Sequence, residues 1–232
     1  VIGGVNHQLL YRDDEAEEFR PVITTDFRET LSPLFFEFDN GHIVYAASNL
    51  ERDKTAIIRF DLHRGEEVGT PVFSHPEVDV SSLIYSRRRK VITAAVFTTW
   101  KRQMAFFDER RETIQRDLEA ALPGYEVVLT SSDKAEVKYL VRTYSDRSLG
   151  SYYLYDADSK HLEKITDVSP WLNEDDMAGM RPIEYPTRDG LTTHGYLTLP
   201  AGVEARRLPI VINPHGGPWA RDSWGYNPEV QL

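Results

Sequence analysis

The chain has 232 residues, enough for one large domain or two modest ones, and its 41% hydrophobic and 28% charged residues are typical of a folded globular protein. Acidic residues outnumber basic ones 37 to 27, and the net charge of -10 argues against nucleic acid as a partner, because phosphate backbones are bound by lysine and arginine. No apolar stretch approaches the roughly 18 residues needed to span a membrane, which predicts a soluble protein. The absence of cysteine excludes disulfides and thiolate sites within these residues and leaves the compartment open between cytoplasm and periplasm.

An internal repeat organises most of the chain. Four β-prone runs each end in an aromatic residue that precedes a polar turn, and these aromatic residues are Tyr11, Phe60, Phe107 and Tyr155. They lie 49, 47 and 48 residues apart. Within each period, branched and aromatic residues mark short strands. Four strands in about 40–50 residues are typical of one blade of a β-propeller.

The strands of three such units can be placed in chain order, after the tail of an earlier unit. The first unit is predicted to have strands at 34–38, 43–47, 55–62 and 70–74. The second is predicted to have strands at 82–85, 91–99 and 102–108, with an amphipathic helix at 112–122 in place of, or beside, a last strand. The third is predicted to have strands at 126–130, 138–144, 151–155 and 162–166. Because closed propellers usually have about four to eight blades, residues 1–172 are predicted to form a partial propeller of about three four-stranded blades in a mainly β protein.

The sequence pattern changes after the third unit. A linker that contains acidic residues is predicted at 173–180, followed by a hairpin with strands at 181–187 and 191–199 around an Arg-Asp-Gly turn. The apolar run at 208–213 lacks alternation, as expected for a strand buried on both faces. Residues 181–232 are therefore predicted to begin a second domain.

The predicted buried strand runs directly into Pro-His-Gly-Gly-Pro-Trp at 214–219. Because adjacent glycines lack Cβ atoms, the backbone can turn sharply there and bring its N–H groups close to a bound group. In α/β-hydrolases a loop of this kind supplies one oxyanion-hole donor, and the loss of such a donor raises the barrier by roughly 3–4 kcal/mol. The alternative is that the glycine pair serves only as a turn.

Five stretches of the last third carry a resemblance to a known family. They are Arg-Pro-Ile at 181–183, Arg-Asp-Gly-Leu at 188–191, Gly-Tyr-Leu-Thr-Leu-Pro at 195–200, Leu-Pro-Ile-Val at 208–211 and His-Gly-Gly-Pro-Trp at 215–219. Together they resemble the entry into the catalytic domain of the prolyl oligopeptidase family, within it the acylaminoacyl-peptidase and dipeptidyl-peptidase-like branch. The resemblance implies that residues 181–232 are the N-terminal part of an α/β-hydrolase domain, truncated before the nucleophile of a serine peptidase.

The resemblance also implies roles for individual residues. The backbone N–H of Gly217 would be the oxyanion donor, with Gly216 permitting the turn and His215 supporting it. Trp219 and Tyr226 would line the substrate pocket, with core packing as the alternative. The family's serine in Gly-x-Ser-x-Gly-Gly, with its Asp and His partners, has no counterpart in the chain, so these residues alone are expected to be inactive. The partners implied are short peptides, which the propeller would admit selectively.

Two other functions stay open. A carboxylesterase-type or lipase-like hydrolase has a similar glycine loop, although such enzymes lack a propeller. A non-catalytic propeller that binds or scaffolds partners would use the glycine pair only as a turn. The 7 histidines include no pair at the i, i+4 spacing of a helix-borne metal site, so neither a metal nor a cofactor is predicted. The sequence does not decide the oligomeric state, and a homo-oligomer is compatible with it.

Overall fold

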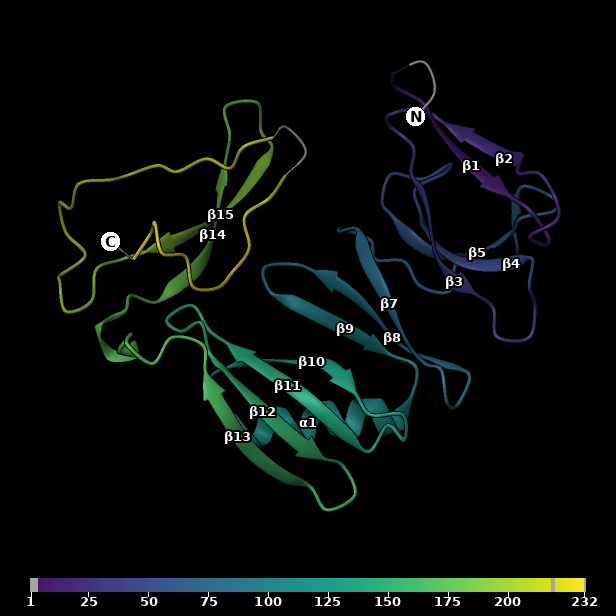
Figure 1. Ribbon diagram of the computed structural model, residues 1–232. Helices are drawn as coiled ribbons and strands as arrows, with labels where there is room; N and C mark the ends of the chain where they lie inside the picture. Colours follow the sequence, from purple (N-terminus) through teal and green to yellow (C-terminus); the bar gives the residue numbers. More distant parts are fainter. Residues whose placement is uncertain (1–3, 218–219, 232) are drawn as a thin grey trace. The chain divides into compact units, whose positions relative to one another are not determined.

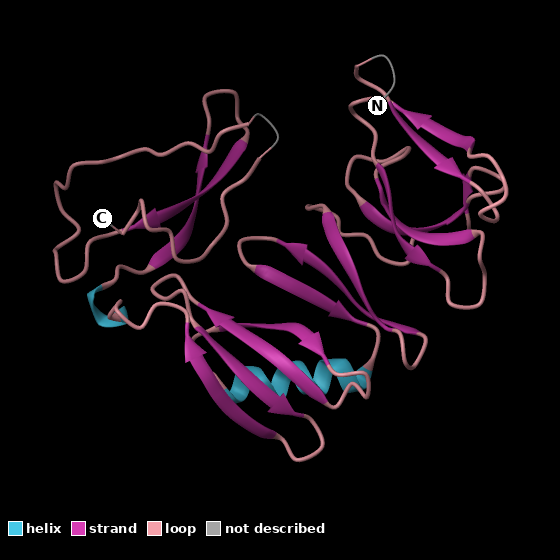
Figure 2. Cartoon of the chain, viewed as in Figure 1, coloured by secondary structure: helices cyan, strands magenta, loops and turns pink. Residues whose placement is uncertain are grey.

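The computed structural model describes residues 4–217 and 220–231, which form mainly antiparallel β-sheets (Figures 1 and 2). Sheets of two, four, three, four and two strands follow one another along this part of the chain. In each sheet the strands pair in sequence order, so that every sheet is a simple meander. The chain divides into two compact units, Val1–Glu112 and Thr113–Leu232.

The first unit contains three of these sheets. The first sheet pairs β1 (His7–Tyr11) with β2 (Arg20–Thr25). The second contains β3 (Leu31–Phe36), β4 (Ile43–Ser48), β5 (Ala56–Asp61) and the short β6 (Glu66–Glu67). The third contains β7 (Val80–Ser86), β8 (Val91–Thr98) and β9 (Arg102–Phe106).

The second sheet is buried on both faces because its side chains alternate between two cores. One core consists of Tyr11, Val44, Ala46, Ala56, Ile58, Phe60 and Leu62, with residues of β1 and β2 packed against it. The other consists of Tyr45, Ala47, Ile57, Val80, Leu83 and Ala95. Successive residues of β4 thus point to opposite faces, as the period of two in a strand requires. The three sheets therefore stack face to face, as propeller blades do.

The second unit is built on one four-stranded sheet. Its strands are β10 (Glu126–Ser132), β11 (Lys138–Tyr144), β12 (Ser151–Asp156) and β13 (His161–Asp167). The helix α1 (Glu109–Ala121) begins at the end of the first unit and packs on this sheet in a core of Ile114, Leu118, Val127, Val141 and Tyr155. The short 3-10 helix η1 (Glu174–Asp176) follows, and then the hairpin of β14 (Met180–Pro186) and β15 (Thr192–Thr198).

The helix begins at a capping aspartate. The Oδ1 of Asp108 accepts a hydrogen bond from the backbone N–H of Arg111 at 2.9 Å, which satisfies one of the free donors of the first turn. The same carboxylate makes a two-pronged contact with the Arg89 guanidinium, at 2.5 and 2.9 Å. The second repeat unit thus has this helix in place of a fourth strand, in agreement with the amphipathic pattern at 112–122.

The structure confirms the mainly β fold and most of the predicted strands, but it corrects the fourth strand of the first unit. Residues 70–74 make only an isolated bridge, in which Ile57 N–H donates to the carbonyl of Phe73 at 2.8 Å. The fourth strand is instead the two-residue β6. Pro71 lacks the N–H group that a continuous ladder would need.

The repeated aromatic residues are buried in three of the four positions. Tyr11, Phe60 and Tyr155 are at most 8% exposed, whereas Phe107 is 40% exposed. Phe107 follows the last strand of a three-stranded sheet, where a helix replaces the strand that would cover it. In the described part of the chain, no helix is long and apolar enough to cross a membrane.

Candidate functional site

The hairpin of β14 and β15 leads the chain toward the glycine loop. The two strands pair from Met180↔Thr198 to Pro186↔Thr192, which confirms the hairpin predicted from the Arg-Asp-Gly turn. The turn is closed by two backbone hydrogen bonds, one from Thr187 N–H to the carbonyl of Leu191 at 2.8 Å. Gly190 lies in the turn at a φ of 85°, a left-handed conformation that favours glycine.

The apolar run at 208–213 does not form the predicted buried strand. No strand is present there, and Ile210, Val211 and Ile212 are 85%, 91% and 84% exposed. A strand buried on both faces needs paired neighbours and covering layers, and none of the described residues supplies them at this segment. The prediction that this apolar segment is a buried strand is therefore wrong for this structure.

The glycine loop is an exposed irregular segment. The Nδ1 of His215 lies 2.9 Å from the carbonyl oxygen of Gly216, so this nitrogen carries the proton and donates it. A peptide unit is planar and trans, and this one joins Gly216 to Gly217. A hydrogen bond to its carbonyl oxygen therefore also sets the direction of the Gly217 N–H. Gly217 has a φ of 147°, which an L side chain rarely adopts, whereas a Cβ on Gly216 would meet nothing within 4 Å.

The two residues predicted to line a substrate pocket have different outcomes. Trp219 lies outside the described residues. Tyr226 is half-buried in the segment that follows the loop, between Trp224 and Asn227, which are also half-buried. Its role in a pocket therefore stays a prediction.

The segment after the glycine loop is tied back to the β10–β13 sheet by a set of polar contacts that we call the clasp. Its residues are Asp146, Ala178, Met180, Trp224 and Gln231. The Gln231 amide donates to the carbonyls of Asp146 at 3.1 Å and Ala178 at 2.8 Å and accepts from the Ala178 N–H at 2.9 Å. Asp146 Oδ2 accepts from Met180 N–H at 2.7 Å, and Trp224 Nε1 donates to the Met180 carbonyl at 2.9 Å.

The clasp fixes both ends of a long excursion of the chain. It holds Met180, where β14 begins, against Asp146 of the β11–β12 turn. It also holds two residues that follow the glycine loop: Trp224 contacts Met180, and Gln231 contacts Asp146 and Ala178. The sequence analysis did not identify these residues, because their partners are mainly backbone groups and backbone groups leave no signal in a sequence.

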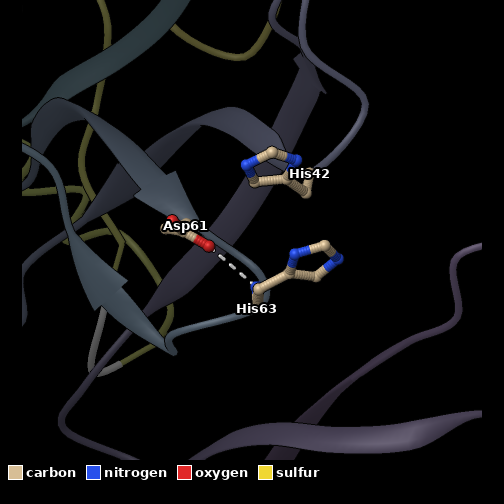
Figure 3. Close-up of side chains that lie close together, drawn as sticks. All are labelled: His42, Asp61 and His63. Atoms are coloured by element: carbon tan, nitrogen blue, oxygen red, sulfur yellow. Dashed lines mark hydrogen bonds between the residues drawn. The ribbon is translucent and has the colours of Figure 1, made fainter.

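A separate cluster in the first unit has the residue types of a metal site. His42, Asp61 and His63 each offer one ligand atom, and these atoms lie within 4.8 Å of one another (Figure 3). The sequence analysis predicted no metal, because the two histidines are far apart in the chain and no local spacing joins them. The β4–β5 register brings them together, since Ile43 pairs with Asp61.

Comparisons with known proteins agree with this architecture. No protein-family model matches the chain. The chain is 27% identical over 215 residues to dipeptidyl aminopeptidase BIII of Pseudoxanthomonas mexicana, which covers 90% of this chain and 30% of that protein. The apo form of prolyl oligopeptidase B from Galerina marginata matches with a TM-score of 0.50 and 12% identity, over 87% of this chain and 30% of that one. A structure from a study of two prolyl endopeptidases matches with a TM-score of 0.54 and 9% identity, over 85% of this chain and 28% of that one.

These matches define the class of the fold, which is that of the propeller portion of prolyl oligopeptidases. The chain spans about 30% of the length of the relatives that it matches. The sequence similarity to a dipeptidyl aminopeptidase agrees with the resemblance that the motifs at 181–219 carry, and the solved structures show the likeness of the fold.

Proposed function

We propose that the protein to which these residues belong is a serine peptidase that hydrolyses short peptides by acyl transfer. In this proposal residues 1–172 belong to the propeller, residues 173–180 are the linker and residues 181–232 begin the α/β-hydrolase domain. The observation that carries the proposal is the 27% identity to a dipeptidyl aminopeptidase over 90% of the chain. A carboxylesterase would lack the blades, and a scaffold would not need the loop.

The chain's own contribution to catalysis would be one oxyanion donor. A serine nucleophile turns the substrate carbonyl into a tetrahedral oxyanion, and an N–H already aimed at that oxygen stabilises the charge without reorganisation. The Gly217 N–H belongs to the peptide unit whose carbonyl is held by His215, so His215 would act as a positioning residue for the donor. The propeller would limit entry to short peptides, and the net charge of -10 would favour substrates with a free amino terminus.

The test begins with the protein purified from its natural source. Its intact mass is compared with 26.7 kDa, and the protein is treated with a serine-directed fluorophosphonate probe. Covalent labelling of one serine, with cleavage of dipeptidyl amides that carry a free amino terminus, is the expected result. Hydrolysis of simple esters without amide cleavage would favour a carboxylesterase. A protein that neither reacts with the probe nor cleaves either substrate would favour the scaffold. Residues 1–232 expressed alone are expected to show no hydrolysis.

The oxyanion role is tested with matched glycine variants of the same full-length protein. Gly217→Ala introduces a side chain at a φ of 147° and is expected to lower kcat by about 10²-fold, the typical loss for one donor. Gly202→Ala is the control, because Gly202 also has a positive φ, of 71°, but lies in an open turn with nothing within 4 Å of its Cβ position. Equal kcat values for the two variants would contradict the oxyanion role while leaving the peptidase assignment intact.

A further inference from the structure

Two turns of the β3–β6 sheet bring two imidazoles and a buried carboxylate to one place. His42 immediately precedes β4, Asp61 is the last residue of β5, and His63 lies in the turn after it. The Leu62 N–H donates to the carbonyl of His42 at 2.8 Å, which fixes the two turns against each other. We propose that His42, Asp61 and His63 bind a first-row transition-metal dication of the Zn²⁺ type, with Asp13 orienting His63 from outside the ligand set.

Asp61 supplies a fixed carboxylate oxygen. Its residue is 8% exposed, and its Oδ1 accepts hydrogen bonds from the backbone N–H groups of His63 at 2.8 Å and Arg64 at 3.1 Å. Figure 3 shows the first of these bonds, which links the carboxylate to the backbone of His63. These two hydrogen bonds hold the carboxylate in place through Oδ1, and its Oδ2 remains for a cation.

Asp13 sets the tautomer of His63. Its Oδ1 lies 2.5 Å from the Nε2 of His63, so Nε2 carries a proton, and in the neutral ring Nδ1 then carries the lone pair that a metal needs. Metal-binding histidines commonly donate their other N–H to a carboxylate in this way. Asp13 is itself held by the hydroxyl of Tyr11, which donates to it at 3.0 Å.

His42 completes the set. Its ring stacks on that of His63, with centroids 4.5 Å apart and an angle of 6° between the planes. Among the described residues, neither ring nitrogen of His42 has a hydrogen-bond partner, so either nitrogen can carry the lone pair that binds a metal. In a tetrahedral site with bonds of about 2.0 Å, ligand atoms lie about 3.3 Å apart. The ligand atoms now lie within 4.8 Å of one another, and rotation of the His42 ring would bring them closer while His63 keeps its contact with Asp13.

The chemistry of the ligands selects the metal. Two neutral imidazoles and one carboxylate suit zinc, copper, nickel or cobalt rather than calcium or magnesium, which prefer oxygen ligands. Two arginines lie near the site: Arg20 is 3.6 Å from Asp13, and Arg64 is 3.9 Å from the Oδ2 of Asp61. The Arg64 side chain is 72% exposed and also contacts Glu66 at 3.4 Å, so it can leave Asp61 when a dication arrives. A bound ion would join the β3–β4 and β5–β6 turns.

In the experiment, the untagged, metal-free protein is titrated with Zn²⁺ at neutral pH, and calorimetry measures the binding. One equivalent of Zn²⁺ is expected to bind, and the thermal unfolding midpoint should rise because the ion binds only the folded state. His42→Ala and His63→Ala should each lower the affinity at least tenfold. Asp61→Asn should also lower it, although the amide oxygen still accepts the turn's backbone hydrogen bonds. His161→Ala, at an exposed histidine of the other unit, is the control and should leave the affinity unchanged.

The role of Asp13 has its own readout. Asp13→Ala should lower the affinity by about 10–100-fold, the usual effect of losing such an outer carboxylate, and Asp13→Asn should recover part of it by accepting from Nε2–H. In the wild-type protein, Zn²⁺ should shift the imidazole NMR signals of His42 and His63 and leave those of the remaining histidines unchanged. The absence of saturable binding, or equal affinity in the wild type and His42→Ala, would overturn the proposal. So would Zn²⁺-induced shifts on histidines other than His42 and His63.

Discussion

Gly150 closes the turn between β11 and β12 at a position where no side chain fits. Its φ is 77°, and a Cβ there would overlap the carbonyl group of Thr143 and lie 2.9 Å from the backbone nitrogen of Tyr144. The backbone cannot easily move away, because Gly150 N–H donates to Ser148 Oγ at 3.0 Å and its carbonyl accepts from Val168 N–H at 2.9 Å. Gly150→Ala is therefore expected to destabilise the protein through two separate effects.

The magnitude of each effect can be worked out. A left-handed alanine costs about 1–2 kcal/mol, and displacement of a packed backbone adds about 1–3 kcal/mol. Gly150→Ala should therefore lower the free energy of unfolding by about 2–5 kcal/mol. Gly124→Ala is the matched control, because Gly124 has a φ of 87° but nothing within 4 Å of its Cβ position. Gly124→Ala should incur only the cost of the left-handed conformation, about 1–2 kcal/mol.

Urea unfolding followed by circular dichroism measures both variants. The two should have the same dependence on urea concentration and different midpoints, with Gly150→Ala clearly the lower. Equal midpoints for the two variants would refute the reasoning, because they would show that the turn relaxes and that only the backbone conformation matters.

Three further predictions concern polar contacts. Asp146→Ala removes a hydrogen bond of the clasp that is expected to contribute about 1–3 kcal/mol, so backbone amides at the start of β14 should exchange faster with deuterium while those of β4 and β5 do not change. Burial and the hydrogen bond to Glu174 raise the pKa of Tyr125 from 10.0 to about 12. The stability that Tyr125 adds over Tyr125→Phe should thus be complete below pH 10.0 and disappear as the pH rises to about 12, as read from unfolding midpoints. The hydrogen bond from Arg89 lowers the pKa of Asp108 below 3.8, so the advantage of the wild type over Asp108→Ala should be present above pH 3.8 and lost in more acidic solution; a pH-independent difference would contradict this.

The repeat was visible in the sequence because it depends on local patterning. Alternating branched and aromatic residues predict strands, and polar turns separate them, so every predicted strand of the three units except the one at 70–74 was located to within a few residues. The helix α1 was equally readable, since Ile114, Leu118 and Leu122 recur at the spacing of a helix face. The fourth strand at 70–74 failed because a local apolar run does not reveal whether its N–H groups can join a ladder, and Pro71 cannot.

The candidate sites depended on tertiary structure to different degrees. The glycine loop at 215–217 is a continuous motif, so the sequence alone located it, but only the structure shows that His215 holds the peptide unit that carries the Gly217 N–H. The strand predicted at 208–213 depended on neighbours that a segment cannot specify by itself. The burial of Ile210 and its neighbours is a property of the surrounding sheet.

The sequence by itself determined the β-rich blade pattern, the hairpin at its Arg-Asp-Gly turn and the position of the glycine loop, because each rests on residues close together in the chain. Only the tertiary structure decided which distant residues meet. His42 and His63 come together through the register of β4 with β5, and Gln231 reaches Asp146 across 85 residues. Such contacts depend on strand pairing and backbone hydrogen bonds, which involve groups that every residue shares and that a sequence therefore does not distinguish.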